Sequence, residues 1–371
     1  MTNVKDIWHI FSTLSVGGPQ RRFADYIART KAGHRHHVYA MDGQYDALKL
    51  MEGLLPLHNG EQVIAKGSTI TATLSCRKFL KAHKPDLLVT YNWGATEWAL
   101  ANSFFPICPT IHIQDGFGEE EQDREITSRR LMRIFSYRNC AKIIVPSLTL
   151  EKIAQHSWHV SKRRLRFIPN GIDVESFSGK ANASALKALG IKNKSKTIGT
   201  VAALRAEKNI GRLIEAFSLV EDKHPDTQLV IVGDGVGTSA LKMLAERVCT
   251  KGRVIFTGNL KQPEQILPAF DIFALSSDTE QMPLSVIEAM ATGLPIVSTD
   301  VGDVRHMVSD ENKPYVADRD AAVMAANLCK LLDTPDAAKT VGNANKLKAK
   351  EQYGIDQMVA AYDQLFTDPT G

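Results

Sequence analysis

Short apolar runs alternate along this chain with longer segments in which apolar residues recur at helical spacing. The runs have the length of β-strands and end at Gly, Pro, Asn or Asp, which favour turns. They cover residues 5–11, 33–41, 86–90, 109–115, 141–147, 166–173, 197–203, 228–235, 254–258, 271–276, 296–299 and 314–317. Helices are predicted between them, at about 20–31, 75–83, from 95, up to 220, 263–270 and 283–292, and from about 321, 336 and 355.

Regular alternation of strand and helix predicts an α/β fold with parallel sheets. At 371 residues the chain is too long for one ordinary core and fits two domains. Residues 178–195 are rich in Ala, Lys and Asn and poor in large apolar side chains, so we place a linker and the domain boundary there. The expected domains are therefore 1–177 and 178–354, followed by a terminal helix at 355–371.

Composition indicates a globular protein with the cytosol as its default compartment. No apolar run approaches the roughly 18 residues that span a bilayer, and residues 1–6 lack the features of a secretory signal. The five cysteines are scattered and form no Cys-x-x-Cys pair, which favours buried reduced thiols over metal ligands or disulfides.

Positive charge is unevenly distributed, although the net charge is only +4. Residues 162–166 form one basic run, and a second stretch contains Arg124, Arg129, Arg130, Arg133, Arg138 and Lys142. Contact with an anionic membrane surface or a lipid-phosphate acceptor is one interpretation, and a solvated basic face is the other.

Residues 276–295 place two carboxylates around the start of a helix. Pro283 suits the first helical turn and Gly293 the position just past the helix end, so Glu280 falls in the loop and Glu288 in the second turn. Free N–H groups near Leu284, together with the helix dipole, suit a phosphate or sugar hydroxyl. Glu288 can accept hydrogen bonds from a ribose diol and Glu280 from sugar hydroxyls. The alternative is a solvated helix with both glutamates on its surface.

This stretch resembles the donor-binding signature of the family-4 retaining glycosyltransferases, in which two glutamates are separated by seven residues and followed by Ala-Met-Ala-x-Gly-x-Pro. The matching residues are Glu280, Glu288, Ala289, Met290, Ala291, Gly293 and Pro295. Gln281 stands where the family usually has glycine. The resemblance adds Met282 and Pro283, with Leu284, to the donor-binding residues.

Further motifs resemble elements of the same family. Gly17 and Gly18, followed by Arg21 and Arg22, resemble its Gly-Gly-x-x-Arg segment, which would face the donor pyrophosphate; a plain turn is the alternative. Residues 203–208 resemble its Arg-Leu-x-x-Glu-Lys element, with Ala203 in place of the arginine, so we assign that role to Arg205 beside Lys208. Gly233 and Gly235 end a strand and would permit close approach of a base or ribose, although this glycine pattern alone is weak.

Polar residues follow two strands of the first domain, where ligands of parallel sheets bind. Asn92 and Trp93 end one strand and are weak acceptor-side candidates with Gln114. The family places a histidine beside the reacting sugar, and His112 is our candidate; a buried core histidine is the alternative. Asp115 is a candidate acceptor-side base or orienting partner, or only closes a turn.

Two apparent metal motifs do not support a metal site. His34, His36 and His37 lie on a strand whose alternation sends His36 and His37 to opposite faces, and no carboxylate or cysteine completes a site. Asp318 and Asp320 have the spacing of an acidic metal-binding pair, but they open a helix, so helix capping is the preferred interpretation.

The resemblance implies a GT-B architecture, two Rossmann-like doubly wound parallel-sheet domains facing across a cleft, with the final helix packing back on the N-terminal acceptor-side domain. It implies a retaining, metal-independent transfer of a sugar from a UDP- or GDP-linked donor to a glycan or lipid-linked glycan, in bacterial envelope polysaccharide assembly. No cofactor and no nucleic acid partner are expected, and the protein would work in the cytoplasm or at the inner membrane face. A sugar-nucleotide epimerase or hydrolase, or a non-catalytic sugar-nucleotide sensor, are the alternatives.

Overall fold

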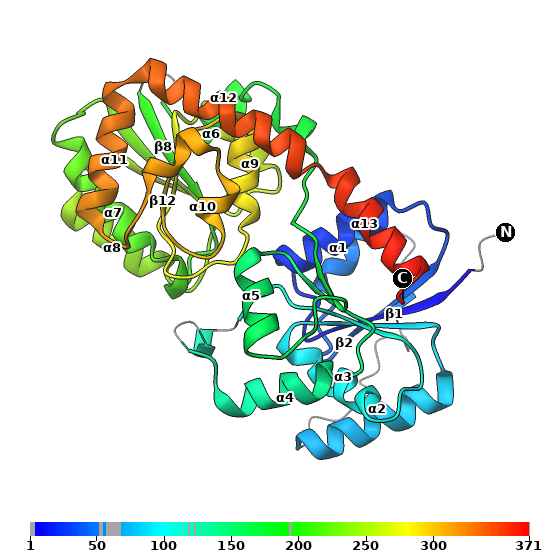
Figure 1. The fold of residues 1–371 in the computed structure, drawn as a ribbon. Coiled ribbons are helices and arrows are strands. Elements are labelled where there is room, and N and C mark those ends of the chain that lie inside the picture. The colour runs from blue at the N-terminus through cyan, green and yellow to red at the C-terminus, as the bar shows by residue number, and fades with distance from the viewer. Residues whose placement is uncertain are drawn as a thin grey trace. The chain divides into compact units, whose positions relative to one another are not determined.

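The computed structural model describes residues 4–51, 55–56, 68–117, 119–121, 124–192 and 195–370. The chain divides into two compact units (Figure 1). Unit 1 comprises Met1–Asn170 and Ile355–Gly371, and unit 2 comprises Gly171–Gly354. The chain therefore passes between the units twice, at residues 170–171 and 354–355.

Unit 1 contains a seven-stranded sheet in the order β3-β2-β1-β4-β5-β6-β7, in which neighbouring strands are parallel. The central strands are buried, because helices cover both faces of a parallel sheet. The strands are β1 (Asp6–Phe11), β2 (Arg35–Ala40), β3 (Leu55–Pro56), β4 (Leu87–Tyr91), β5 (Thr110–Ile113), β6 (Lys142–Val145) and β7 (Leu165–Phe167).

Alternate residues of β1 face two separate cores. Ile7 and Phe11 pack with α1 and α13, which lie side by side (Figure 1). Trp8 and Ile10 pack in the other core, with residues of α2 and α3. The helices of unit 1 are α1 (Gly18–Arg29), α2 (Thr69–His83), α3 (Thr96–Ser103), α4 (Thr127–Tyr137), α5 (Leu148–His156) and α13 (Ile355–Thr367).

Unit 2 repeats this arrangement with a six-stranded parallel sheet in the order β10-β9-β8-β11-β12-β13. Its strands are β8 (Lys196–Val201), β9 (Thr227–Val232), β10 (Val254–Gly258), β11 (Ile272–Leu275), β12 (Ile296–Thr299) and β13 (Val316–Ala317). Its helices are α6 (Ala183–Ala188), α7 (Ile210–Glu221), α8 (Thr238–Val248), α9 (Leu284–Thr292), α10 (Val304–Met307), α11 (Ala321–Asp333) and α12 (Pro335–Gln352).

In both sheets the order of strands reverses beside the first strand of the unit. Successive crossovers lead to one side from β1 and from β8, and the chain then returns to the other side of the same strand at β4 and at β11. Such a switch point leaves a crevice at the carboxyl ends of the strands, where α/β proteins bind ligands. A ligand site in unit 2 is therefore expected at the carboxyl ends of β8 and β11.

Two expectations differ from the structure. The segment expected to be a linker contains α6, and its apolar residues Leu186 and Ile191 are buried in the core of unit 2. The chain leaves unit 1 earlier, at Asn170. The helix expected at 263–270 is two short 3-10 helices, Pro263–Gln265 and Leu267–Ala269, because Pro268 lacks the N–H that a continuous helix needs at that position.

Among the described residues, no helix combines the length and the apolar character required to cross a bilayer.

Candidate functional site

The loops after β8 and β11 meet because these strands are parallel neighbours whose carboxyl ends lie at the same edge of the sheet. The loop after β8 carries Arg205 and Lys208, and the loop after β11 carries Glu280. The Nζ atom of Lys208 lies 2.7 Å from Oε1 of Glu280. Ser277 Oγ donates a hydrogen bond of 2.8 Å to the same oxygen. The structure thus brings together two of the predicted catalytic residues.

Both charges of this pair are largely shielded from water. The side chain of Lys208 is 18% exposed and that of Glu280 is 10% exposed. Attraction between opposite charges is stronger where water is excluded, and each side chain keeps the other in a defined place. The pair therefore presents a fixed cation and a fixed carboxylate at the end of the sheet.

Arg205 lies in the same loop but is mostly exposed. Its Nε atom is 2.9 Å from Oε1 of Glu207, and 55% of its side chain is accessible to solvent. It precedes the short 3-10 helix Ala206–Lys208 and has an extended backbone. Because the guanidinium of Arg205 is already exposed, it can contact a ligand that binds from solvent.

Helix α9 has the boundaries that the sequence predicts. Pro283 directly precedes its first residue, Leu284, and Gly293 ends it in the left-handed conformation, with φ at +89°. Glu280 lies in the preceding loop and Glu288 in the second helical turn, half-buried. Met282 and Pro283 are buried, and Leu284 is half-buried. The helix start thus offers backbone N–H groups and a positive dipole end beside the Glu280 loop.

Gly233 and Gly235 contact the protein's own backbone. A Cβ atom on Gly233, whose φ is +135°, would lie 1.8 Å from the carbonyl oxygen of Ala202, and one on Gly235 would lie 2.6 Å from that of Leu204. Leu204 N also donates to Asp234 O at 3.0 Å. These glycines therefore let the loop after β9 pack against the loop that carries Arg205, while approach of a nucleotide to them stays a prediction.

Gly17 and Gly18 stand at the start of α1. Gly17 is the residue before the helix, with an extended backbone, and Gly18 is its first residue. A Cβ atom on Gly17 would lie 2.8 Å from Oε1 of Gln20, which leaves little room for a side chain. The pair follows β1, so it lies beyond the carboxyl end of that strand, as the sequence predicts.

Asp115 is already engaged by neighbouring side chains. It forms an ion pair with Arg22, whose side chain is only 5% exposed, and Arg22 Nη1 also donates to Asn170 Oδ1 at 2.9 Å. Asn92 Oδ1 accepts from Asp115 N at 2.7 Å, and Asn92 Nδ2 donates to Asp115 Oδ2 at 3.3 Å. The sequence left three interpretations of Asp115 open, an acceptor-side base, an orienting partner and a turn-closing residue, and these contacts match an orienting partner better than a free base.

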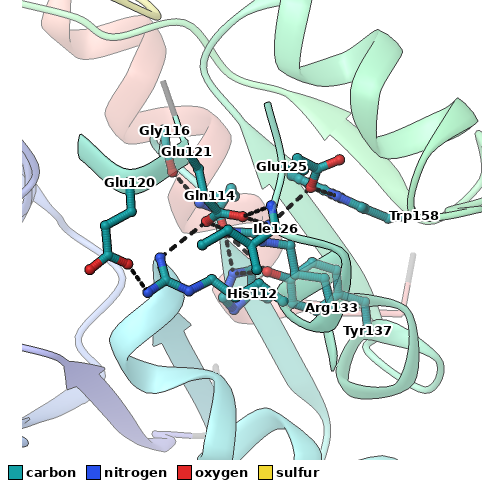
Figure 2. A network of polar contacts seen from close by, with 11 residues as sticks. His112, Gln114, Gly116, Glu120, Glu121, Glu125, Ile126, Arg133, Tyr137 and Trp158 are labelled. Atoms are coloured by element: carbon teal, nitrogen blue, oxygen red, sulfur yellow. Dashed lines mark hydrogen bonds and ion pairs between the residues drawn. The ribbon is translucent and has the colours of Figure 1, made fainter. Parts of the chain in front are cut away.

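His112 lies in the interior of unit 1 (Figure 2). Its Nδ1 atom is 2.8 Å from Thr90 Oγ1, and Nε2 is 2.9 Å from the hydroxyl of Tyr137 and 3.2 Å from Oε1 of Gln114. Burial lowers the pKa of His112 to about 3, so the ring is neutral near pH 7. The burial and contacts of His112 are those of a core histidine, which was the alternative interpretation of this residue. Gln114 is buried beside it.

A buried ion-pair network, which the sequence did not reveal, lies next to these residues (Figure 2). Arg133 is fully buried; its Nη2 atom lies 2.5 Å from Glu121 and its Nη1 atom 2.9 Å from Glu125. Trp158 Nε1 donates to Glu125 at 2.6 Å. The guanidinium of Arg133 is 5.1 Å from the ring centre of Trp93, which is half-buried. The sequence carries one signal of this network, because the acidic run at residues 119–121 is followed by the arginine-containing segment that forms α4.

This network shows that only some of the basic residues between Arg124 and Lys142 form an exposed positive surface. Arg133 and Lys142 are buried, and Arg129 pairs with Glu120. The exposed members are Arg124, Arg130 and Arg138.

Neither metal motif forms a cluster in the structure. Asp320 caps α11 by accepting from Val323 N at 2.9 Å, which confirms the capping interpretation. Among the residues that the structure describes, no group of three or more His, Cys, Asp or Glu side chains is arranged to hold a metal ion.

Comparison with protein families matches both units. Residues 17–176 match the model described as Glycosyltransferase Family 4, and residues 183–348 match Glycosyl transferases group 1. Among curated proteins, UDP-Gal:alpha-D-GlcNAc-diphosphoundecaprenol alpha-1,3-galactosyltransferase of Escherichia coli is 28% identical over 246 residues, which is 64% of each chain. N-acetyl-alpha-D-glucosaminyl L-malate synthase of Bacillus anthracis is 23% identical over 55% of this chain and 54% of its own. The chain thus matches less than two thirds of the length of these relatives.

Alpha-monoglucosyldiacylglycerol synthase of Streptococcus pneumoniae is 30% identical over 52% of this chain and 45% of its own. Among solved structures, Anabaena HepE in complex with UDP and glucose superposes with a TM-score of 0.81 at 17% identity, covering 98% of this chain and 99% of that one. WaaG, described as a glycosyltransferase involved in lipopolysaccharide biosynthesis, gives a TM-score of 0.75 at 18% identity, covering 98% and 100%. These structures establish the GT-B fold, and with the two family matches they show that the chain belongs to the family-4 glycosyltransferases.

Proposed function

We propose that this protein is a retaining glycosyltransferase that moves a sugar from a UDP- or GDP-linked donor to a glycan or lipid-linked glycan acceptor, without a bound metal, in assembly of bacterial envelope polysaccharide. The observation that carries the proposal is the shielded ion pair of Lys208 and Glu280. It lies at the carboxyl ends of β8 and β11, and its carboxylate belongs to the loop that leads into α9. Complexes of Anabaena HepE with UDP and with UDP-glucose support a nucleotide-sugar donor.

In this proposal, charge on the departing diphosphate is the main demand on the site. Lys208 and Arg205 supply positive charge to it, and the N-terminus of α9 supplies backbone N–H groups. Glu288 accepts hydrogen bonds from the ribose, and Glu280 accepts them from the donor sugar. Two side chains and a helix dipole thus perform the stabilisation that a divalent cation performs in other transferases.

The transfer itself exchanges one bond for another at the anomeric carbon. The bond between that carbon and the diphosphate oxygen breaks, and the acceptor hydroxyl oxygen bonds to the same face. The acceptor proton passes to the leaving diphosphate oxygen, so no covalent enzyme intermediate is needed. His112 and Asp115 serve here as supports of the acceptor-side wall, because both side chains are held by contacts within unit 1.

A donor panel tests this proposal directly. Thermal unfolding is followed with UDP, GDP and their common sugar conjugates, since a ligand at 100 times its Kd stabilises the folded state by about 2.7 kcal/mol. We expect one base to raise the melting temperature and one conjugate to be turned over, with unchanged rate in chelator and with the donor anomeric configuration kept in the product. Release of free or epimerised sugar without acceptor, or binding without turnover, would contradict it.

A patch on unit 1 supports contact with a membrane-bound acceptor. On α4, Leu131 and Phe135 are each 47% exposed, and Phe135 stacks on the exposed Phe104, with ring centres 6.4 Å apart. Arg130 and Arg138 are exposed on the same helix or at its end. Apolar side chains flanked by arginines are suited to an anionic bilayer surface. The names of two relatives refer to diphosphoundecaprenol and diacylglycerol, which are lipids.

Vesicle sedimentation tests this contact. We expect binding to vesicles that contain phosphatidylglycerol and little binding to neutral phosphatidylcholine vesicles. The double variant Leu131→Ser with Phe135→Ser should lose binding, whereas Val236→Ser, which changes a 96% exposed residue of unit 2, should not. Equal binding by both variants would rule out this patch.

A further inference from the structure

Arg212, from the first turn of α7, holds the beginning of the loop that carries Glu280. Its Nη1 atom donates to the carbonyl oxygen of Ser276 at 2.7 Å, and its Nη2 atom lies 2.6 Å from Oδ1 of Asp278. The side chain of Arg212 is 13% exposed, so this contact is shielded from competing water. The loop after β11 is therefore tied to the helix that follows the loop after β8.

Asn209 makes a second connection to the same carboxylate. Its Nδ2 atom donates to Asp278 Oδ2 at 2.9 Å, while its Oδ1 atom accepts from the backbone N–H of Arg212 at 3.2 Å and caps α7. The backbone of Asn209 is left-handed, with φ at +40°, a conformation that asparagine tolerates better than most residues. Both oxygens of Asp278 are thus held by residues shortly after Lys208, one at the cap of α7 and one in its first turn.

Backbone contacts complete the connection. Asp278 N donates to Glu207 O at 2.9 Å, and Ser276 Oγ donates to Lys208 O at 3.1 Å. The loop that carries Lys208 and the loop that carries Glu280 are therefore in direct contact, although the two residues are far apart in the chain. The contacts of Asp278 act on the backbone around the ion pair and not on its charged atoms.

We propose that Asp278, held by Asn209 and Arg212, is a positioning residue that sets the geometry of the Lys208–Glu280 pair. This inference rests on the proposed transferase function, in which that pair meets the diphosphate and the donor sugar. Displacement by about 1 Å of groups that contact reacting atoms can lower a rate about 100-fold. Nucleotide binding through Glu288 should be affected much less, because Glu288 lies in the second turn of α9 and not in the loop that these contacts hold.

The variant Asp278→Asn tests the inference, with Asp271→Asn as its matched control. Asp271 lies at the other end of β11, and its carboxylate accepts from Lys196 Nζ and Thr197 N, each at 2.8 Å. In Asp278→Asn an amide nitrogen replaces one of the two accepting oxygens and faces the donor of either Arg212 or Asn209, so one of the two contacts is lost. Asn209→Gly, which keeps the left-handed backbone and removes the side chain, is the milder second variant.

Two readouts are measured on all variants. In hydrogen exchange, the amides of residues 205–209 and 276–282 should lose protection together in Asp278→Asn and Asn209→Gly but not in Asp271→Asn. In steady-state kinetics, kcat should fall about tenfold or more in Asp278→Asn, with the KM for the donor changed less than about threefold. An equal kcat in Asp278→Asn and Asp271→Asn, or unchanged protection of 205–209, would overturn the inference. A wild-type protein without transferase activity would reject the proposed function, and the exchange data would still decide whether the loops are coupled.

Discussion

The Nζ atom of Lys208 lies 2.7 Å from Oε1 of Glu280, although β9, β10 and β11 separate the two residues in the chain. The contact forms because β8 and β11 are neighbours at the point where the strand order reverses. A cation and a carboxylate therefore face each other at the end of the sheet, and in the proposed function the first serves the leaving group and the second the donor sugar. A bound donor would have to compete with, or share, an existing ion pair.

Removing either charge of this pair should strongly reduce transfer while leaving the fold intact. In Glu280→Gln and Lys208→Met we expect kcat to fall by about 10²–10³, the usual cost of deleting one group that stabilises transition-state charge. Turnover of the donor identified by the panel is the measurement, and circular dichroism checks the fold. Lys261→Met, which changes an exposed lysine of unit 2, should keep full activity. Full activity in both site variants would reject the assignment.

Glu288 should act mainly on donor affinity. If its carboxylate accepts hydrogen bonds from the ribose, Glu288→Gln should raise the KM for the donor about tenfold or more, since hydrogen bonds to a charged group are worth about 1.5–3 kcal/mol. The change in kcat should be smaller, because the ribose contact is made in both ground and transition states. Calorimetric titration with the free nucleotide measures this directly. An unchanged nucleotide Kd would place the ribose elsewhere.

The strand and helix alternation and the boundaries of α9 followed from the sequence, because each depends on local pattern. Pro283 and Gly293, for example, mark the ends of α9 through the lost N–H of one and the left-handed backbone of the other. Such signals act over a few residues. They need no knowledge of how distant side chains pair. Lys208 and Glu280 were assigned to one site through the family resemblance, and the neighbouring positions of β8 and β11 bring them into contact.

What the sequence could not reveal depends on distant partners. His112 lies one residue before the end of β5, yet Thr90 and Tyr137 hold it in the interior. Arg133 looked like its exposed neighbours in a basic run until Glu121 proved to lie against it. Asp115 looked available as a base until Arg22 was found beside it. In each case one residue type suits both a buried pair and an open site, and only the tertiary structure distinguishes them.

Gly235 should be required for the loop that carries Arg205. In Gly235→Ala the new Cβ atom would lie 2.6 Å from the carbonyl oxygen of Leu204, so one of the two loops must move. We expect a loss of about 1–3 kcal/mol in the free energy of unfolding, typical of overpacking, together with weaker nucleotide binding. Gly179→Ala, where a Cβ atom meets nothing within 4 Å, should change stability little. Similar urea midpoints for the two variants would contradict the expectation.

Buried histidines should make the protein acid-sensitive. Nε2 of His9 lies 2.9 Å from Nδ1 of His36 in unit 1. Burial, together with the charge of neighbouring histidines, lowers the pKa of His9 well below 6.5. Burial also lowers the pKa of His36 to about 4. As the pH falls below about 6.5, these two histidines take up protons in the unfolded chain but stay neutral in the folded chain. Stability is therefore complete above pH 6.5 and declines as the pH falls toward 4, by up to about 1.4 kcal/mol per pH unit and histidine.

Urea unfolding at several values between pH 7.5 and 4.5 measures this decline. His36→Asn removes one titrating group and should make the dependence on pH shallower, whatever its effect at pH 7.5. His156→Asn, which changes an exposed histidine, should leave the slope as in the wild type. Identical slopes for all three proteins would show that other groups control the acid response.

Arg133 should matter for stability far more than the neighbouring arginines of α4. It is fully buried against Glu121, whose carboxylate is also inaccessible, so Arg133→Met would leave that charge without its main partner. Breaking a buried pair from one side costs about 3–5 kcal/mol, whereas substitution of an exposed charge usually changes stability by less than about 0.5 kcal/mol. We therefore expect a much lower urea midpoint for Arg133→Met than for Arg130→Met, whose arginine is exposed on the same helix. The double variant Arg133→Met with Glu121→Gln should recover part of the loss, because it removes the unpaired charge. Equal midpoints for the two single variants would mean that the carboxylate finds another partner, or water, when the guanidinium is gone.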